Sequence, residues 1–207
     1  MWWTRAGVII GLSGTVFLIW NLFYVRRSTD AAVNANKVVR ESMIADNRAW
    51  LSVSDIMAEG DFRSGKWGAE MTISIKITNA GKTPALDAHT HIEMVPYGGD
   101  VPDLLRALCQ KNKTKTPWGR LVLPTESYRR PWGPTTSLET IESVGSKYGS
   151  FVVIGCVTYQ VLHDENFHQT AFVYHPTARG GKGFIAFGNN VPKSEISFTV
   201  GSGGFAT

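Results

Sequence analysis

Two histidines that lie two residues apart are the first candidates for chemistry in this sequence. His89 and His91 are flanked by Asp87 and Glu93. Residues two apart on a β-strand point to the same face, so these four side chains would share one face. Imidazole and carboxylate groups are ligands of Zn²⁺, which makes the face a candidate metal site. A solvent-exposed face of a sheet has the same composition, and we favour that interpretation and predict no metal.

A second cluster of potential ligands lies further along the chain. Its thiol, imidazole and carboxylate groups belong to Cys156, His163, Asp164, Glu165 and His168. Copper sites also place Cys and His near the end of a strand, but they usually add a Met close downstream. No Met follows Met94 in this sequence. We therefore interpret Cys156 as a buried core thiol, and we predict no catalytic, cofactor-binding or metal-binding residue.

A basic stretch over residues 104–130 is the third candidate. Its basic side chains are Arg106, Lys111, Lys113, Lys115, Arg120, Arg129 and Arg130, against Glu126 as the one acidic side chain. Trp118 and Tyr128 are interleaved with them, and the tripeptide Pro-Trp-Gly occurs at residues 117–119 and again at 131–133. Such a surface can contact anionic lipid headgroups or another polyanion. The alternative, which we favour, is a solvated loop.

The overall charge of the chain gives no reason to expect nucleic-acid binding. The formal net charge is +4, and Arg5, Arg26 and Arg27 supply three of the positive charges. Residues 28–207 therefore carry 18 basic and 17 acidic side chains, which is nearly neutral. A nucleic-acid-binding domain usually carries a concentrated basic excess. We exclude nucleic acid as a partner.

The two cysteines, Cys109 and Cys156, are too few for a disulfide framework. They can form one bridge in an oxidising compartment. They can equally remain two buried thiols in the cytoplasm. The spacing does not distinguish these alternatives.

Short strands are the elements that must position these candidates. We expect strands over residues 50–56, 70–78, 86–94, 121–123, 136–144, 150–162, 169–175, 183–187 and 195–200. The clearest is 70–78, where Met71, Ile73, Ile75 and Ile77 alternate with polar residues, a pattern typical of an antiparallel sheet with one buried face. We expect a connection over 58–68, a turn over 79–84, one helix over 101–113 and a loose tail over 201–207. Strands without alternating helices favour an immunoglobulin-like β-sandwich.

Residues 6–25 predict a membrane anchor that precedes this domain. The segment is 20 residues without charge, bracketed by Arg5 and by Arg26 and Arg27, which is long enough to cross a bilayer as one helix. No small-residue cleavage site follows, so we expect an uncleaved anchor. More basic residues follow the segment than precede it, which favours a cytoplasmic position of the soluble domain by a small margin.

A second helix is predicted directly after the anchor, over residues 28–49. This segment contains no Gly or Pro and carries small residues at heptad spacing. Together with Gly7, Gly11 and Asn21, the helix over 31–49 can support a parallel homo-oligomer by close helix approach and a shared polar contact. The alternative is a single anchor, in which short glycine spacings are also common.

Several local motifs together resemble a group of uncharacterised bacterial membrane-anchored proteins. The matching segments are Arg48-Ala49-Trp50, Asn79-x-Gly81-x-Thr83-Pro84-Ala85, Gly155-Cys156-Val157-x-Tyr159 and His168-Gln169-Thr170-x-Phe172. The resemblance implies one N-terminal transmembrane helix, a short Ala-rich helix and an immunoglobulin-like domain at the bacterial inner membrane. It implies no activity and no functional residue. In the turn motif we expect Gly81 to adopt a positive φ.

The sequence therefore predicts a mainly β protein with four parts. These are a transmembrane anchor over 1–27, a juxtamembrane helix over 28–49, an immunoglobulin-like antiparallel β-sandwich over 50–200 and a flexible tail over 201–207. We predict a non-enzymatic single-pass membrane protein whose sandwich is an interaction or assembly module for an unknown protein partner. The alternatives are an enzyme domain that uses the histidine clusters to bind a metal or ligand, and a module that binds anionic lipid or polyanion through the basic stretch.

Overall fold

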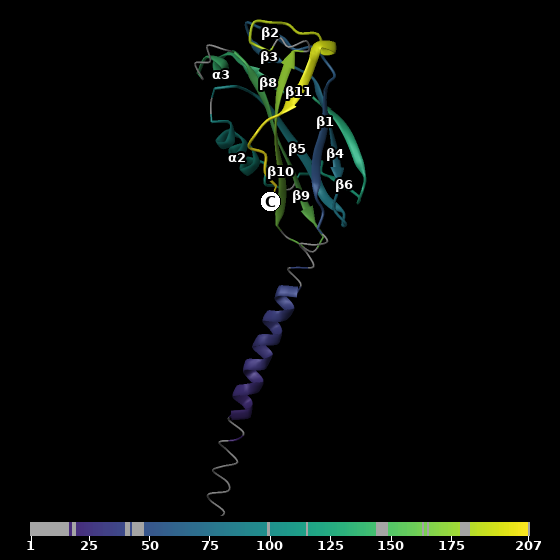
Figure 1. Ribbon diagram of the computed structural model, residues 1–207, viewed down its shortest axis with the longest axis vertical. Coiled ribbons are helices and arrows are strands. Elements are labelled where there is room, and N and C mark those ends of the chain that lie inside the picture. Colours follow the sequence, from purple (N-terminus) through teal and green to yellow (C-terminus); the bar gives the residue numbers. More distant parts are fainter. Residues whose placement is uncertain are drawn as a thin grey trace, which may run out of the picture. The chain divides into compact units, whose positions relative to one another are not determined.

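The computed structural model of the chain describes residues 17, 20–39, 42, 48–98, 100–114, 116–143, 149–162, 164, 166–178 and 183–206. The chain forms two compact units, Met1–Asn47 and Arg48–Thr207. Each unit has its own elements (Figure 1).

The described part of the first unit is helix α1, residues 20–39, whose described side chains are all exposed. Most of the predicted anchor, residues 6–16, 18 and 19, lies outside the described residues, as do Gly7 and Gly11. Within the described part of the chain, no helix is both long and apolar enough to cross a membrane. The side chain of Asn21 donates to the backbone oxygen of Phe17 at 3.1 Å, within its own helix.

Three antiparallel sheets make up the second unit. The first has the strand order β1 (Leu51–Ala58), β4 (Ile73–Asn79), β7 (Ser127–Trp132). The second has the order β11 (Ile196–Val200), β10 (Phe167–Ala178), β9 (Phe151–Val161), β5 (Ala85–Pro96), β6 (Arg120–Val122). The third and smallest has the order β2 (Arg63–Gly65), β3 (Gly68–Glu70), β8 (Thr135–Ser137).

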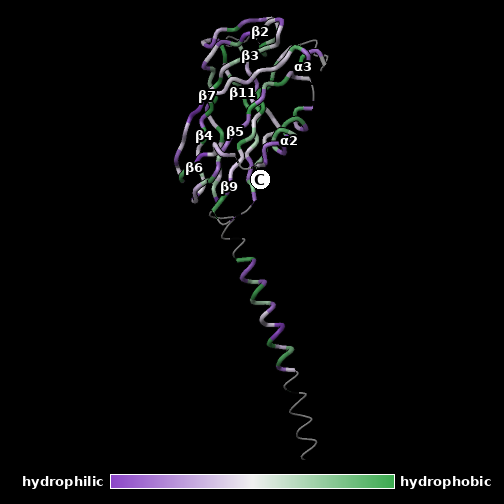
Figure 2. The backbone as a smooth tube through the Cα atoms, turned by 180° about the vertical axis from the view of Figure 1, so that it is seen from behind, coloured by the Kyte–Doolittle hydropathy of each residue, from purple (hydrophilic) through white to green (hydrophobic). Residues whose placement is uncertain are grey.

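Buried side chains of the two larger sheets form one hydrophobic core. Isoleucines 73, 75 and 77 of β4 are fully buried in the same cluster as Val153 and Val157 of β9 and Phe172 of β10. Hydrophobic and hydrophilic residues are interspersed along these strands (Figure 2). The unit is mainly β and antiparallel, consistent with the predicted β-sandwich.

A helix, α2 (Val101–Lys111), covers the other face of the five-stranded sheet. Leu105, Leu108 and Cys109 of α2 are buried in a second cluster with alternate residues of β9 and β10. A disulfide joins Cys109 to Cys156 of β9, with the Cα atoms 5.5 Å apart. The interpretation of Cys156 as a thiol is therefore wrong, because α2 places a second sulfur against it.

Most predicted strands are confirmed, but three segments differ. The predicted connection over 58–68 contains β2. Of the strand predicted over 136–144, the described residues 136–143 form the end of β8 and then helix α3 (Leu138–Ser143). The Ser137 hydroxyl caps this helix by accepting from the backbone N–H of Thr140 at 3.2 Å. Residues 183–187 make only isolated bridges, at Phe184 and Ala186.

One strand, β7, is absent from the prediction because its sequence has no hydrophobic alternation. It is an edge strand, and most of its side chains are exposed. Pro131 is tolerated there because an edge strand leaves one row of backbone groups unpaired. Polar composition and a proline hide such a strand from any pattern-based prediction.

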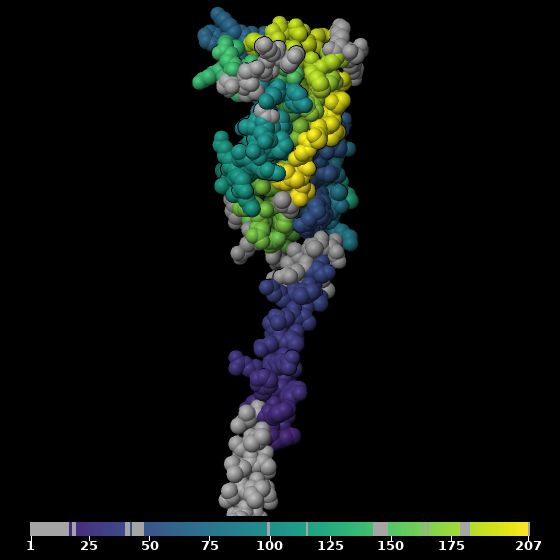
Figure 3. All heavy atoms as spheres, turned by 60° about the vertical axis from the view of Figure 1, so that its left-hand side comes forward, coloured from purple at the N-terminus to yellow at the C-terminus, as the bar shows by residue number. Residues whose placement is uncertain are grey.

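The segment after β11 is attached to the domain, in contrast to the predicted loose tail. The backbone N–H of Ala171 donates to the Phe205 oxygen at 2.7 Å, and Gly201 donates to Val173 at 2.9 Å. Phe205 packs against the cluster beneath α2. Figure 3 shows this segment, in yellow, on the surface beside α2, in teal. A short 3₁₀ helix, η1 (Lys193–Glu195), precedes β11.

Gly81 is required for close packing rather than for a positive φ. Gly81 does not adopt a positive φ, in contrast to the expectation from its turn motif. A Cβ atom at this position would lie within 3.0 Å of backbone atoms of Arg48, Ala49 and Trp50. The turn after β4 is therefore pressed against the segment where the chain enters the domain.

Candidate functional site

The first candidate site is a groove between β5, β6 and β7, which we call the basic groove. Its volume is about 470 Å³. The lining residues are Ala88, His89, Thr90, His91, Thr116, Trp118, Arg120, Tyr128, Arg129, Arg130 and Trp132. β6 pairs with β5 only between Ala85 and Ala88. The groove lies beyond this pairing, where residues of β5 and of the edge strand β7 line it together.

A bulge in β5 positions one wall of the basic groove. The strand register shifts between Leu86 and His89. Asp87 adopts a φ of 50°, a conformation that Asp tolerates better than most residues. The Asp87 carboxylate accepts from the backbone N–H of Thr116 at 3.2 Å. A Cβ atom on Gly119 would clash with Asp87, so the loop that carries Trp118 is held tightly on β5.

The two predicted histidines lie side by side in this wall, with ring centroids 5.7 Å apart. Both ring nitrogens of His89 face backbone oxygens, that of Asp87 at 2.9 Å and that of Asn112 at 3.2 Å. Burial, followed by the positive charges of His89 and Lys111, lowers the pKa of His91. Among the described residues, no group of three or more His, Cys, Asp or Glu is placed to hold a metal ion.

Three arginines of the predicted basic set meet in the groove, each beside an aromatic ring or a carboxylate. Arg120 pairs with Glu126 at 2.9 Å and lies 4.8 Å from the centroid of Tyr128. Arg129 pairs with Asp55 and donates to the hydroxyl of Ser74 at 3.1 Å. The guanidinium of Arg130 lies 5.0 Å from the ring centroid of Trp132.

The lining of the groove carries arginines and histidines but no Asp or Glu side chain, which makes the groove electropositive. Every charged or imidazole side chain among its lining residues is basic. A backbone N–H from Leu123 and the Arg120 guanidinium hold the pKa of the Glu126 carboxyl below its usual range. Burial raises the pKa of Tyr128, so its hydroxyl stays protonated at neutral pH. The groove can therefore receive an anionic group between arginines and aromatic rings.

The remaining predicted basic residues lie elsewhere. Arg106, on α2, pairs with Asp103 at 3.1 Å, and both side chains are exposed. Lys111 ends α2, and Lys113 lines a different cavity near the disulfide. Lys115 lies outside the described residues. The basic stretch is therefore divided between two surfaces. One is on α2, which packs against the five-stranded sheet, and the other includes β7, at the edge of the first three-stranded sheet.

The groove contains two tryptophans, of which Trp118 was noted among the basic residues of the sequence and Trp132 was not. Trp118 and Trp132 are the central residues of the two Pro-Trp-Gly tripeptides, and both line the groove. Trp118 is 84% exposed. The repeated tripeptide was the signal in the sequence that could have identified Trp132 as well.

The second predicted cluster contains a hydrogen-bonded pair of side chains, Asp164 and His168. His168 Nε2 lies 2.9 Å from a carboxylate oxygen of Asp164. Burial opposes ionisation of Asp164, but hydrogen bonds from the Asn166 backbone N–H and from His168 outweigh it and lower the pKa of the carboxyl. Cys156 is bonded to Cys109, and residues 163 and 165 lie outside the described part of the chain.

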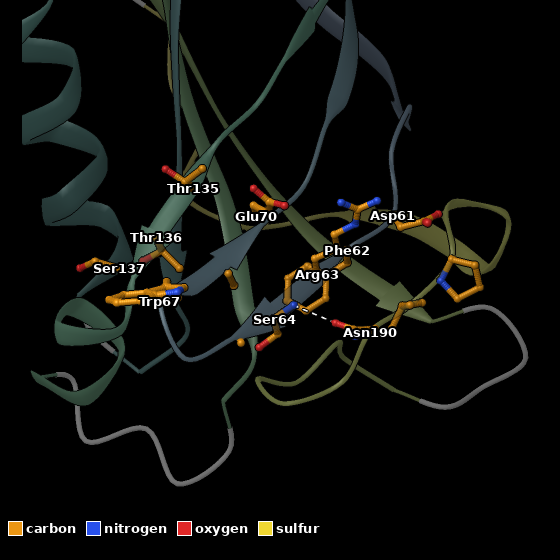
Figure 4. Close-up of a pocket in the computed structure, with 15 residues that line it drawn as sticks. Asp61, Phe62, Arg63, Ser64, Trp67, Glu70, Thr135, Thr136, Ser137 and Asn190 are labelled. Atoms are coloured by element: carbon orange, nitrogen blue, oxygen red, sulfur yellow. Dashed lines mark hydrogen bonds between the residues drawn. The ribbon is translucent and has the colours of Figure 1, made fainter.

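A second groove, of about 770 Å³, lies on the smallest sheet; we call it the hairpin groove (Figure 4). It is lined by Asp61, Phe62, Arg63, Ser64, Gly65, Trp67, Gly68, Ala69, Glu70, Thr135, Thr136, Ser137, Asn190, Val191 and Pro192. No sequence pattern predicted it, because its residues come from three segments that lie far apart in the sequence. Trp67, in the turn between β2 and β3, is 83% exposed.

Comparison with known proteins assigns no family to this chain. No family model, no curated protein and no solved structure matches the chain.

Proposed function

We propose that this chain is a non-enzymatic, single-pass membrane protein whose immunoglobulin-like β-sandwich is an interaction module for an acidic segment of a protein partner. The observation that carries the proposal is the basic groove, whose lining holds Arg120, Arg129 and Arg130 beside the half-buried rings of Tyr128 and Trp132 and includes no carboxylate. Membrane tethering and location are separate parts of the proposal, each with its own support.

The anchoring part rests on residues 6–25 of the sequence, which carry no charge. Large apolar side chains among the described residues of this segment are exposed, which supports this part of the proposal. Phe17, Trp20, Leu22 and Phe23 are each more than 60% exposed. Apolar surface of this extent usually marks a membrane or protein contact.

We also propose that the sandwich lies outside the cytoplasm, which reverses the location favoured by the charge balance around the anchor. The disulfide between Cys109 and Cys156 supports this side. Disulfides persist in oxidising compartments and are rare in the cytosol. The cytoplasmic expectation rested on a small excess of basic residues after the anchor over those before it. We give the disulfide more weight than this small difference.

The groove favours an acidic peptide for a geometric reason. A guanidinium binds a carboxylate through two parallel N–H donors, and an indole beside it supplies apolar contact for the rest of the peptide. Glu126 and Asp55 already neutralise Arg120 and Arg129 in part. Arg130 has no ion pair with any described carboxylate, so it is the residue that we expect to contact the partner first.

Binding of poly-L-glutamate to the purified full chain tests this proposal. We expect binding that weakens as salt rises, because exposed charges are screened. Arg130→Ala should weaken it at least about tenfold, the equivalent of one buried charge-assisted contact. Lys82→Ala, which removes the same charge from an exposed turn, should leave it unchanged. Equal binding by all three proteins would contradict the proposal.

A second candidate function, binding of anionic lipid headgroups, is favoured by the same arginines and by the predicted tether. Full chain reconstituted in phosphatidylcholine can be offered free vesicles with and without phosphatidylglycerol. Co-sedimentation that needs phosphatidylglycerol and is lost in Arg130→Ala, without binding of poly-L-glutamate, would favour lipid over an acidic peptide.

Location is tested by fusing alkaline phosphatase or a fluorescent protein after residue 207. Phosphatase activity without fluorescence is the expected result. Fluorescence without phosphatase activity would place the sandwich in the cytoplasm and contradict the location proposed here. It would leave the basic groove as a candidate for cytoplasmic partners.

A further inference from the structure

We propose that the hairpin groove binds a linear, neutral glycan chain. The inference goes beyond the proposed function, because it adds a second partner class at a separate site. It is drawn from one exposed aromatic platform, one row of polar side chains and one row of glycines, all on the small sheet of β2, β3 and β8.

Trp67 provides the platform. Its side chain is 83% exposed in the turn between β2 and β3, and the ammonium of Lys66 lies 5.2 Å from its ring centroid. An exposed indole is a large apolar surface that usually marks a contact site. The C–H face of a pyranose ring is flat and apolar, so it can stack on the indole while the hydroxyl groups point outward.

A row of polar side chains crosses the sheet beside this platform. The strand register pairs Arg63 with Glu70, and Glu70 with Thr135. All three residues are exposed. A guanidinium donates, a carboxylate accepts, and a hydroxyl does both. Sugar hydroxyls also donate and accept, so this row matches them better than it matches a single charge.

The neighbouring row leaves room for the ligand. The register places Gly65 opposite Gly68, and Gly68 opposite Ser137. Because residues two apart share a face, Gly65 lies on the same face as Arg63. A Cβ atom on Gly65 would meet nothing within 4 Å. The absence of a side chain there leaves open space between the polar row and the indole.

The far end of the groove is held in place by hydrogen bonds. The Asn190 side-chain oxygen accepts from the backbone N–H of Ser64 at 2.9 Å, and Asp61 accepts from that of Lys193 at 2.9 Å. In the close-up, Trp67 lies beside β8 at one end, and Asp61 and Asn190 lie at the other (Figure 4). Pre-ordered polar groups lower the entropic cost of binding. Their separation from Trp67 fits an extended chain rather than one sugar ring.

Charge distinguishes this groove from the basic groove. Asp61 and Glu70 oppose Arg63 among its lining residues, so the lining favours neither an anion nor a strongly cationic ligand. A neutral ligand with many hydroxyl groups suits such a balanced, open surface. The two grooves therefore have different ligands and can be tested against each other.

The test measures binding of chitohexaose, cellohexaose and maltohexaose to the purified full chain by calorimetry, in a detergent without a sugar headgroup. We expect at least one of these to bind. Trp67→Ala should weaken that binding at least about tenfold. Trp118→Ala removes an equally exposed tryptophan from the other groove and should leave it unchanged. Gly65→Phe should block binding sterically, while Gly65→Ala should not.

The outcomes separate this inference from the proposed function. Poly-L-glutamate binding should survive in Trp67→Ala, which also reports that this variant is folded, and should fall in Arg130→Ala. Failure of all three oligosaccharides to bind at millimolar concentration overturns the glycan inference and leaves the interaction module intact. Equal losses in Trp67→Ala and Trp118→Ala also overturn it, because a specific site depends on only one of them.

Discussion

The hydroxyl of Tyr159 donates to the backbone oxygen of Ala49 at 3.3 Å, across 110 residues of sequence. Both residues are fully buried. Burial raises the pKa of Tyr159, so the hydroxyl remains a donor at any physiological pH. The bond attaches the segment where the chain enters the sandwich to β9, the central strand of the larger sheet.

Tyr159→Phe should reduce the free energy of unfolding by about 1 kcal/mol, and by more if the Ala49 oxygen finds no other donor. Urea unfolding monitored by circular dichroism measures the change. Tyr97→Phe, at an exposed tyrosine, serves as the control and should have no effect. A Tyr159→Phe protein as stable as the parent would show that this hydrogen bond contributes nothing.

The buried side chain of Asn79 connects three segments. Its amide nitrogen donates to the backbone oxygens of Thr83 at 2.9 Å and Val122 at 3.0 Å. Its oxygen accepts from the backbone N–H groups of Gly81 at 2.9 Å and Trp50 at 3.3 Å. Only an amide offers both sets of groups at this position.

Asn79→Ala should therefore destabilise the domain by about 3 kcal/mol, since it leaves several buried backbone groups unsatisfied. Asn79→Asp should be at least as harmful, because a carboxylate oxygen would face two carbonyl oxygens. Thermal unfolding checks both variants, with exposed Lys82→Ala as the control. A small loss in Asn79→Asp relative to Asn79→Ala would indicate that water replaces the missing donors.

The disulfide closes a loop between residues separated by 47 positions. Its removal should lower the free energy of unfolding by about 4 kcal/mol, through the greater entropy of the unfolded chain. The measurement compares urea unfolding of the parent with and without reductant, and of the Cys109→Ala, Cys156→Ala double variant. The double variant should not respond to reductant. Two alkylatable thiols in protein extracted without reductant would contradict the bridge and the proposed location.

The pair of Asp164 and His168 predicts a pH dependence with a defined sign. The pKa of Asp164 is lowered in the folded protein, relative to about 3.9 in the unfolded chain. The stabilisation is therefore complete above the unfolded pKa and is lost as the pH falls through the folded pKa.

Urea midpoints of the parent and Asp164→Asn, measured from neutral to acidic pH, check this dependence. The difference between the two proteins should be constant above about pH 5 and should shrink below about pH 4. An Asp61→Asn variant controls for the general effect of removing a carboxylate. A difference that grows on acidification would have the wrong sign for a lowered pKa.

Two glycines that flank the β2–β3 turn should respond differently to alanine. Gly68 has a φ of 128°, and a Cβ atom there would clash with the backbone of Thr136. Gly65 has neither constraint. Gly68→Ala should destabilise the protein by about 1 to 3 kcal/mol, whereas Gly65→Ala should be neutral or slightly stabilising. Hydrogen exchange in the hairpin, measured alongside the melting temperature, checks both; similar exchange in the two variants would refute the difference.

Local patterns in the sequence determined the elements with a strong hydrophobic period. The alternation around Ile73, Ile75 and Ile77 identifies β4, and the continuous apolar run at 151–157 identifies the central strand β9, because burial of one or both faces selects these residues. Helix α2 lies within the helix that was predicted over residues 101–113. The basic character of residues 104–130 was evident from composition alone.

Only the tertiary structure decided which of these residues meet. It divided the basic stretch between α2 and the basic groove, paired Cys109 with Cys156, and built the hairpin groove from segments around residues 61–70, 135–137 and 190–192. Short strands such as β2, β3 and β7 carry no periodic signal, because they are too short or too polar to show a hydrophobic alternation. β2 and β3 form a local hairpin, but β3 also pairs with β8 and β7 pairs with β4, which lie far away in the sequence. Sites made by such long-range pairing depend on packing of the whole sandwich, which no local pattern encodes.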